Sequence, residues 1–271
     1  MKNNQVFLRD TGVAKKIVDS AEIESEDVVL EIGSGDGRLT GLLAEMAGKV
    51  YAVEKDIYLL DEAKMKLDGM KNIVFINADI LVTNIPEDTT KIVANLPYDI
   101  SSPVTEIVVS FMNKKRGTSA VLMYQKEFGE RMMSVPGFRD YSMLSVFCQY
   151  TCYIEKIMNV SKNCFKPRPK VDSIVLKLRP KDVEIDRSFL KLAKLLFQHK
   201  KKSLYSAMMD IRENLNASSK DELRERLSAL GEDRLKRKVF YFDVQELINI
   251  YEDVVRLSIW TGKNPGKEKT R

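Results

Sequence analysis

The 271-residue sequence predicts an α/β fold, with a parallel sheet covered by helices on both faces and a smaller, all-helical domain after it. Two observations support this prediction. Short β-rich runs alternate with amphipathic helical stretches over most of the chain. Beyond Pro180 the pattern is helical throughout, and a proline at the end of the last strand is typical of a boundary. We therefore expect one domain over 1–180 and a second over 181–271, with a frayed C-terminal tail.

Seven strands are expected in the first domain. Apolar residues at helical spacing, such as Leu39, Leu43 and Met46, separate the first strands. Two further strands, near 148–158 and 172–179, would close the sheet around a proline-rich loop. The other five are apolar runs that predict buried parallel strands, VVLEIG (28–33), VYAVE (50–54), IVFINAD (73–79), KIVANLP (91–97) and SAVLMY (119–124).

Composition narrows the class of protein. No signal peptide is evident, and no apolar run approaches the roughly 20 residues that a bilayer requires, so we expect a soluble, cytoplasmic protein. Three cysteines without a CxxC pair argue against a disulfide framework or a zinc site, and no metal is expected. The net charge of +5 arises in 181–238, which holds 15 basic and 10 acidic residues. Either a polyanion-binding surface or an ordinary solvated helical face would have this excess.

Glycines and acids at three successive strand ends predict a nucleoside-binding site. Gly33 and Gly35 follow the first strand, where glycine lets the backbone turn tightly and approach a ligand. Glu54 ends the second strand and could accept both ribose hydroxyls. Asp79 ends the third strand and could accept the amino group of an adenine, with Ile80 as an apolar face. Each acid alone could be a helix N-cap, but the three positions together favour a nucleoside.

The segment NLPY (95–98) after the fourth strand predicts a centre that methylates adenine. The N6 amino group is a weak nucleophile, and two acceptors on its hydrogens would aim it at a methyl–sulfur axis about 3 Å away. The Asn95 side-chain oxygen is one acceptor, and a backbone carbonyl near Leu96 or Pro97 is the other. Tyr98 offers a ring on which the base can stack, worth about 1–3 kcal/mol. In isolation NLPY would be an ordinary turn.

A basic, proline-rich loop contains one aromatic residue, in NCFKPRPKVDS (163–173). A base inside a duplex is inaccessible, so the target must be unpaired or flipped into the pocket. Phe165 could hold the second face of that base, and Lys166, Arg168 and Lys170 beside it suit single-stranded nucleic acid. The alternative is a core phenylalanine in a connection between strands.

Four segments together resemble the ribosomal RNA adenine dimethyltransferase family, of the KsgA type. They are QVFL (5–8), EIGSGDGRLT (31–40), NLPYDISSP (95–103) and FKPRPKVDS (165–173). The resemblance implies the seven-stranded, Rossmann-like sheet of class I methyltransferases, a helical RNA-contacting domain and S-adenosylmethionine as cofactor. The cofactor contacts that it implies, with those argued above, are Val6, Leu8, Gly33, Gly35, Glu54, Lys55, Asp79, Ile80 and Asn95.

The same resemblance implies the substrate and its contacts. Members modify two adjacent adenosines in the 3′-terminal hairpin of small-subunit rRNA, within a pre-ribosomal small subunit, adding two methyl groups to each. We expect a monomer that binds neither metal nor membrane. The stretch FQHKKKS (197–203) resembles the family's basic segment, although a solvated helical surface would have the same composition. It implies phosphate contacts by Lys200, Lys201 and Lys202.

Three departures and four alternatives accompany the resemblance, and one of the departures is Asp99, which follows NLPY where the family commonly has Asn. Val6 stands where the family has Asn or His, and the basic arm before QxFL is reduced to Lys2. A large-subunit rRNA adenine methyltransferase is a near alternative, against which NLPY and the KVDS ending argue. An intact NLPY also argues against a non-catalytic nucleic-acid-binding factor on the same fold. Leu96 argues against a DNA adenine methyltransferase, whose motif has proline there, and a nicotinamide oxidoreductase would not need NLPY.

Overall fold

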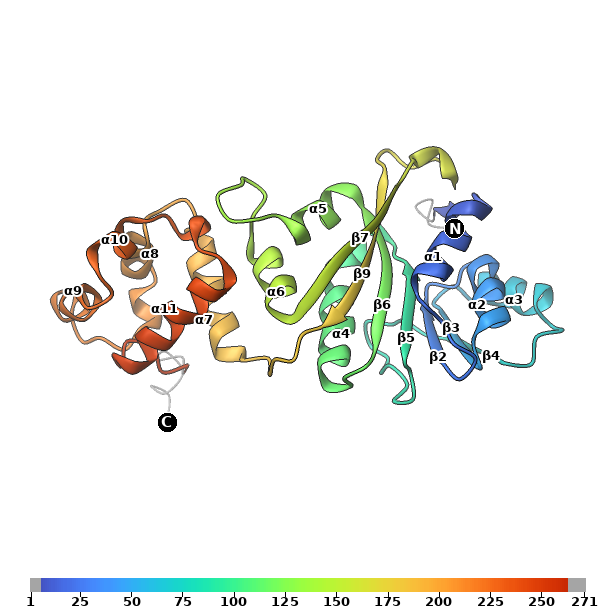
Figure 1. The fold of residues 1–271 in the computed structure, drawn as a ribbon, viewed down its shortest axis with the longest axis horizontal. Coiled ribbons are helices and arrows are strands. Elements are labelled where there is room, and N and C mark those ends of the chain that lie inside the picture. The colour runs from blue at the N-terminus through green and yellow to red at the C-terminus, as the bar shows by residue number, and fades with distance from the viewer. Residues whose placement is uncertain (1–5, 263–271) are drawn as a thin grey trace. The chain divides into compact units, whose positions relative to one another are not determined.

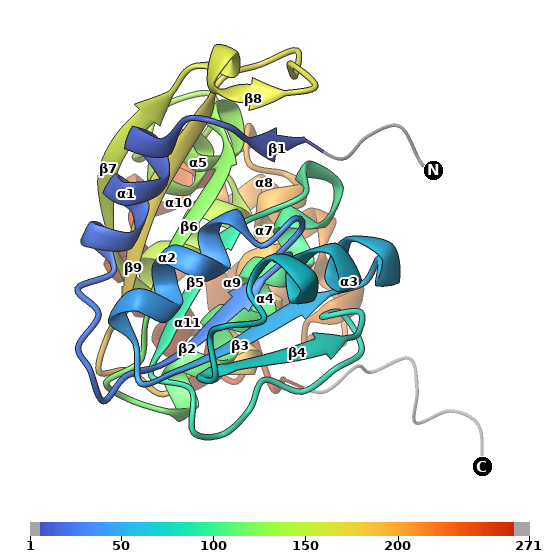
Figure 2. The ribbon, with the colours of Figure 1, turned by 90° about the vertical axis from the view of Figure 1, so that its right-hand side faces the viewer.

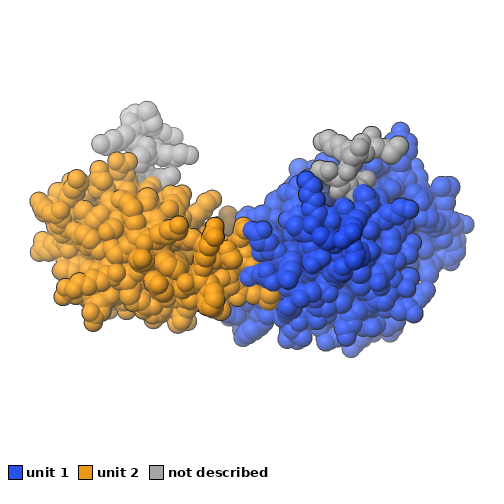
Figure 3. Space-filling view, turned by 90° about the horizontal axis from the view of Figure 1, so that it is seen from above, with its two compact units in different colours: residues 1–130, 151–183 blue, residues 131–150, 184–271 orange. Residues whose placement is uncertain are grey.

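The computed structural model describes residues 6–262, which form two compact units. Unit 1 comprises residues up to 130 and 151–183, and unit 2 comprises 131–150 and 184 onward, as Figure 3 colours them. The expected division at 180 therefore lies close to the observed one at 183, but the segment 131–150 groups with the helical unit. The reason is that Tyr141, Val146 and Tyr150 are buried in the core of that unit. Lys2 and the expected frayed tail lie outside the described residues.

Unit 1 is built on a seven-stranded sheet in the order β4-β3-β2-β5-β6-β9-β7 (Figure 1). The first five strands in this order run parallel, and β9 and β7 pair antiparallel at one edge. This confirms the predicted α/β class. The strands are β2 (Val28–Ile32), β3 (Lys49–Glu54), β4 (Ile73–Asn77), β5 (Lys91–Asn95), β6 (Ser119–Gln125), β7 (Cys152–Val160) and β9 (Ser173–Pro180).

Helices cover both faces of this sheet, because each parallel strand requires a crossover connection to the next. Ile17 and Leu43, from α1 and α2, are buried in one core with Val121 of β6. On the opposite face of β6, the Tyr124 hydroxyl lies 2.9 Å from the Thr105 hydroxyl of α4. The helices of this unit are α1 (Thr11–Ser20), α2 (Arg38–Met46), α3 (Ile57–Lys66), α4 (Ser101–Lys114) and the start of α5 (Lys126–Met133).

Two elements differ from the sequence prediction. The strand expected near 148 begins only at Cys152, because the preceding residues form the helix α6 (Met143–Thr151). A short apolar run does not distinguish a buried strand from a buried helix. The second difference is a small antiparallel sheet of β1 (Phe7–Leu8) and β8 (Phe165–Lys166), which joins the N-terminal segment to the basic loop (Figure 2).

Unit 2 is all-helical, as predicted. Asp186 caps the N-terminus of α7, and Asp243 forms a capping box with Glu246 at the start of α11. Phe189 and Trp260 are among the large side chains buried between these helices. None of the described helices is long and apolar enough to cross a membrane. From residue 184 onward the helices are α7 (Arg187–Gln198), α8 (Leu204–Asp210), α9 (Lys220–Ser228), α10 (Glu232–Lys236) and α11 (Val244–Arg256).

Candidate active site

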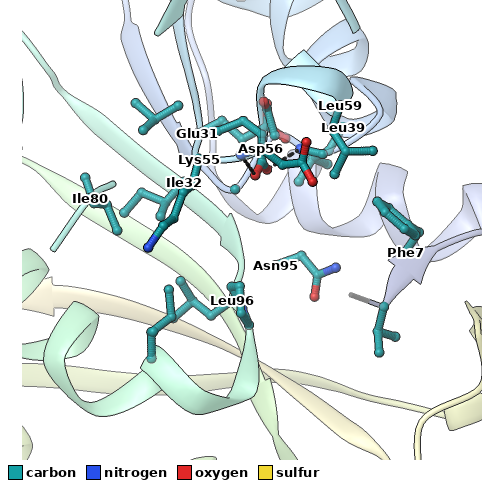
Figure 4. A pocket seen from close by; sticks show the side chains of 18 of the residues that line it. Phe7, Glu31, Ile32, Leu39, Lys55, Asp56, Leu59, Ile80, Asn95 and Leu96 are labelled. Atoms are coloured by element: carbon teal, nitrogen blue, oxygen red, sulfur yellow. Dashed lines mark hydrogen bonds between the residues drawn. The ribbon is translucent and has the colours of Figure 1, made fainter. Parts of the chain in front are cut away.

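A cavity of about 690 Å³ opens at the carboxyl ends of β2, β3, β4 and β5 in unit 1. Ligands of α/β proteins bind at this edge of the sheet, and the volume is that of a small-molecule site. Figure 4 shows Glu31 of β2, Lys55 after β3, Ile80 after β4 and Asn95 of β5 around the cavity, with Phe7 from the N-terminal segment. The structure thus brings together Lys55, Ile80 and Asn95, which the sequence predicted separately, with two side chains that it did not predict.

The glycine turn after β2 brings the backbone close to its neighbours. Gly33, Gly35 and Gly37 have φ angles of 76°, 54° and 80°, a region that other residues rarely adopt. A Cβ at Gly35 would lie 3.3 Å from Cε1 of Phe7, and one at Gly37 would lie 2.9 Å from Cβ of Ala63. The turn therefore presents bare backbone to the cavity at Gly35, and lets α2 begin directly against α3 at Gly37.

Glu54 is held rigidly at the end of β3. Its Oε2 accepts a hydrogen bond from the Gly35 amide at 3.0 Å, and its Oε1 accepts one from the Asp56 amide at 2.9 Å. The side chain is 8% exposed and lines the cavity. The N-cap of α3 is Asp56, whose carboxylate accepts from the Tyr58 amide, so Glu54 is not a helix cap. Each Glu54 oxygen keeps a free lone pair for a hydroxyl in the cavity.

Asp79 lies beyond β4 with its carboxylate ionised and anchored. It accepts a hydrogen bond from the Lys55 ammonium at 2.6 Å and one from the Leu81 amide at 3.0 Å. These bonds, that of Lys55 foremost, hold the pKa of Asp79 below its usual range. Asp79 caps a turn rather than a helix, since no helix follows it before β5. Ile80 is buried beside it and lines the cavity.

Asn95 is the last residue of β5 and directs its amide into the cavity (Figure 4). Within residues 6–262 this amide makes no hydrogen bond with the protein, although the residue is half-buried. A polar group in such a position is available to a ligand. Its backbone is fixed, because Asn95 is paired with Met123 at the end of the ladder between β5 and β6.

The backbone after Asn95 offers one open carbonyl. The Pro97 carbonyl accepts from the Ile100 amide at 3.2 Å, as part of the turn at Tyr98–Ile100. The Leu96 amide donates to the Met123 carbonyl at 3.2 Å, whereas no hydrogen bond to the Leu96 carbonyl is found among the described residues. Of the two carbonyls considered from the sequence, the structure therefore favours that of Leu96.

The Tyr98 ring lines the same cavity and is fixed at its hydroxyl end. Its hydroxyl lies 3.1 Å from Oγ of Ser173, a fully buried residue at the start of β9. Ser173 belongs to the KVDS segment, to which the sequence analysis assigned no role of its own. The hydrogen bond ties the turn after β5 to the antiparallel edge of the sheet.

Comparisons with known proteins bear on these features. Residues 1–245 match the sequence model of the family described as ribosomal RNA adenine dimethylase. The chain belongs to this family. A probable ribosomal RNA small subunit methyltransferase A from Thermococcus sibiricus is 36% identical over 250 residues, which is 92% of this chain and 89% of the relative. Membership confirms the predicted methyltransferase class and S-adenosylmethionine as its cofactor.

Two solved structures extend the comparison. A dimethyladenosine transferase from Plasmodium falciparum superposes with a TM-score of 0.81 at 29% identity, covering 93% of this chain and 98% of that one. The 23S rRNA methyltransferase ErmE superposes with a TM-score of 0.66 at 25% identity, covering 92% of this chain and 99% of that one. Both agree with the seven-stranded sheet and the helical unit described above.

The cavity fits the family's cofactor. Gly35 leaves bare backbone where a side chain would fill the space, and the Glu54 oxygens are held so that two neighbouring hydroxyls can each donate to one of them. From the N-terminal side, Val6 and Leu8 line the cavity and add apolar surface. In the part of the chain that the structure describes, no group of three or more His, Cys, Asp or Glu side chains could hold a metal ion.

The structure corrects the prediction that Phe165 holds the second face of the target base, because this residue does not line the cavity. It is 5% exposed and packs in the sheet core with Leu8, its register partner in β1. The alternative of a core phenylalanine therefore describes this structure, since the β1–β8 pairing turns the ring inward. By contrast, Lys166, Arg168 and Lys170 of the same loop are exposed, as expected of phosphate contacts.

The lysine cluster after α7 is also corrected in part. Lys200 donates from its ammonium to two backbone carbonyls of the segment 131–150, at 2.9 and 2.7 Å, and burial lowers its pKa. It therefore holds two segments of unit 2 together rather than facing solvent. Lys202 forms an ion pair with Asp210 at 2.6 Å, and Lys201 is exposed.

Glu31 is a cavity residue that the sequence analysis missed. It is fully buried in β2, and its Oε2 accepts a hydrogen bond of 2.5 Å from the Thr40 hydroxyl. Burial raises the pKa of Glu31 to about 8, and the bond from Thr40 acts in the opposite direction. The sequence did contain a signal for Glu31, since it is the one acid in the otherwise apolar strand VVLEI. Acids are almost never buried without a partner, so an acid at such a position is unusual.

The N-terminal segment contributes a second contact that was missed. Arg9 forms an ion pair of 3.0 Å with Asp36 in the glycine turn, and its guanidinium lies over the Phe7 ring. This contact holds the segment across the cavity. No local sequence pattern predicts it, because it joins residues 27 positions apart.

Proposed function

We propose that this protein transfers methyl groups from S-adenosylmethionine to N6 of two adjacent adenosines in the 3′-terminal hairpin of small-subunit rRNA, giving N6,N6-dimethyladenosine. It acts as a cytoplasmic monomer on a pre-ribosomal small subunit during ribosome biogenesis. The observation that carries the proposal is the Asn95 amide, open to the cavity beside the Leu96 carbonyl and behind a nucleoside site. The small-subunit and dimethyladenosine names of its relatives support it.

The cofactor is held by residues from four strand ends. Glu54 accepts the two ribose hydroxyls, Asp79 accepts the adenine amino group, and Ile80 packs on the adenine face. Lys55 acts through its ion pair with Asp79, which fixes the carboxylate. When bound, S-adenosylmethionine supplies an electrophilic methyl group. Glu31 faces the cavity as a buried acid, and a nearby ammonium group, such as that of an amino acid, would favour its ionised form.

The target adenine is oriented by the turn after β5. The Asn95 oxygen and the Leu96 carbonyl accept the two hydrogens of N6, which directs the nitrogen lone pair away from both and toward the methyl group. Tyr98 stacks on the base, and Ser173 fixes that ring through the hydroxyl. No strong base is needed, because the N6 proton becomes acidic only as the N–C bond forms. The buried walls of the cavity exclude water, which favours a reaction in which positive charge is dispersed.

Exposed basic residues position the RNA. Lys166, Arg168 and Lys170 lie on the loop that β8 attaches to the N-terminal segment. In unit 2, Lys201 and Lys202 contact phosphates, although Lys202 also forms an ion pair with Asp210. These contacts are made to phosphates, so they orient the substrate without reading its sequence.

A large-subunit adenine methyltransferase is the second candidate, favoured by the similarity to ErmE. The relatives named for the small subunit share more identity with this chain, 36% against 25%, and the dimethyladenosine transferase superposes better. The two functions differ in their substrate particle and in the number of adenosines modified, which is one in the large subunit and two in the small subunit.

Methyl transfer to defined particles tests the proposal. The purified chain is incubated with labelled S-adenosylmethionine and with small subunits from cells that lack the two dimethyladenosines, with large subunits, or with duplex DNA. We expect transfer to small subunits alone, and mass spectrometry of the rRNA should show N6,N6-dimethyladenosine. The variant Asn95→Ala should abolish transfer while it still unfolds at the wild-type temperature. Transfer to large subunits, or full turnover by the variant, would contradict the proposal.

A further inference from the structure

Three segments of unit 2 that are distant in sequence meet at one corner. The Gly137 amide donates to the Phe240 carbonyl at 2.8 Å, and the Phe240 amide donates to the Lys200 carbonyl at 3.1 Å. The Lys200 ammonium adds its two bonds to carbonyls of the first segment. We call the result the corner surface, and it comprises the loop 134–142 between α5 and α6, the turn 199–203 between α7 and α8, and the turn 237–241 before α11.

Large apolar side chains are exposed on the corner surface. Phe138 is 65% exposed, Val135 51% and Tyr241 46%. The Tyr241 ring is fixed, because it stacks on Phe240 with 4.5 Å between centroids and covers Gly137, where a Cβ would lie 3.2 Å from its Cε1. Apolar side chains gathered at such exposure, with polar residues around them, indicate a binding surface.

Positive side chains surround these rings. Arg139, Lys201 and Lys238 are exposed, and no ion pair is found for any of them within the described residues. Burial lowers the pKa of Lys200 most; Asp140 acts in the opposite direction, and Lys201 and Arg139 lie near enough to lower it further, so positive charges are gathered at one place. Asp140 is the one acid in the loop 134–142, all of which the structure describes.

We propose that the corner surface binds an RNA strand of the substrate particle, with Phe138 and Tyr241 stacked on unpaired bases. Arg139, Lys201 and Lys238 would contact the adjoining phosphates. Aromatic rings within a basic field are the combination that binds single-stranded nucleic acid, and the excess of positive charge selects a polyanion over an apolar protein partner. The inference deepens the proposed function, because it rests on that function for the identity of the particle.

Equilibrium binding to small subunits tests the corner surface without requiring catalysis. The subunits come from cells lacking the two dimethyladenosines, and binding is measured in the absence of cofactor. The double variant Phe138→Ala, Tyr241→Ala should bind them at least about 30-fold more weakly, as expected for the loss of two base stacks. Tyr153→Ala removes a ring that is 61% exposed on β7 of unit 1, and as a matched control it should bind like the wild type.

The charges are tested separately. Arg139→Gln with Lys201→Gln should lower the slope of log affinity against log salt by about 1.5, which is the loss of roughly two phosphate contacts. Affinity for S-adenosylmethionine should stay unchanged in all these variants, since none of the residues lines the cavity. Binding within twofold of the wild type by the aromatic variant, or an unchanged salt slope, would overturn the inference.

Photocross-linking distinguishes RNA from protein. A photoreactive phenylalanine analogue at position 138 should cross-link to rRNA, and a cross-link to a ribosomal protein instead would overturn the inference. If the wild type binds subunits through this surface but transfers no methyl group, the proposed function fails while the surface stands. If the wild type methylates subunits and the aromatic variant binds them equally well, only the surface is refuted.

Discussion

The anchored carboxylate of Glu54 allows the contribution of one residue to cofactor binding to be worked out. It accepts the Gly35 amide at 3.0 Å and the Asp56 amide at 2.9 Å, with one oxygen for each. Glu54→Gln keeps the shape but replaces one oxygen by an NH₂ group. One backbone N–H then faces a donor, and one ribose hydroxyl loses its charged acceptor.

The expected size of the effect follows from these two losses. A hydrogen bond to a charged group contributes about 1.5–3 kcal/mol, so S-adenosylmethionine should bind roughly 10- to 150-fold more weakly. The unsatisfied backbone amide, which belongs to a half-buried residue, should also cost about 1–3 kcal/mol of folding free energy. That corresponds to a fall in Tm of about 2–12 °C for a domain of this size.

Calorimetric titration with S-adenosylmethionine and thermal unfolding without it measure the two effects. The matched control is Glu62→Gln on α3, whose carboxylate pairs with Lys66 at 2.7 Å on the exposed face of the helix. This control should change neither quantity measurably. Cofactor affinity of Glu54→Gln within threefold of the wild type would refute the assignment of Glu54 to the ribose.

Three further predictions concern the cavity and its surroundings. Ser173→Ala removes the partner of the Tyr98 hydroxyl and should lower kcat/KM up to about 10-fold without changing cofactor affinity; Tyr98→Phe should match it, and wild-type rates in both would contradict the positioning role. Glu31 has a folded-state pKa of about 8 against 4.5 when unfolded, so the unfolded chain releases this proton first as pH rises. The free energy of unfolding should therefore fall as the pH rises from about 4.5 to 8, by up to about 1.4 kcal/mol per pH unit. Urea unfolding should show a smaller fall for Glu31→Gln than for the wild type over this range, and equal falls in the two proteins would exclude the effect. Phe165→Ala should lower the free energy of unfolding by about 3 kcal/mol, and lost methyl transfer at unchanged stability would instead restore a stacking role.

Several parts of the site could be predicted because they follow from local order along the chain. Gly35, Glu54, Asp79 and Asn95 each come directly after an apolar run. In a parallel sheet such positions share one edge, so the strand order alone brings them together, and all of them line the cavity. The side chain of Glu31 faces the same cavity, but Glu31 lies within an apolar run and does not follow one. The pattern that predicted the other residues therefore did not predict it.

Contacts between distant segments could not be predicted in this way. The Phe165 ring is directed inward by pairing with β1, which depends on Leu8 more than 150 residues earlier in the chain. Lys200 belongs to a basic run, yet its ammonium is taken by carbonyls of the 131–150 segment. Whether a basic or aromatic side chain is free depends on such partners, and composition does not specify them.

The sequence by itself determined the α/β class, the parallel arrangement of the first strands and the chemical character of the cofactor site. These depend on hydrophobic periodicity and on residues that follow strands, both of which are local. Only the tertiary structure decided which side chains remain available, such as Asn95 and Phe138, and which are consumed by packing, such as Phe165 and Lys200. Burial and hydrogen bonding are shared between segments far apart in the chain, so these outcomes exist only once the chain has folded.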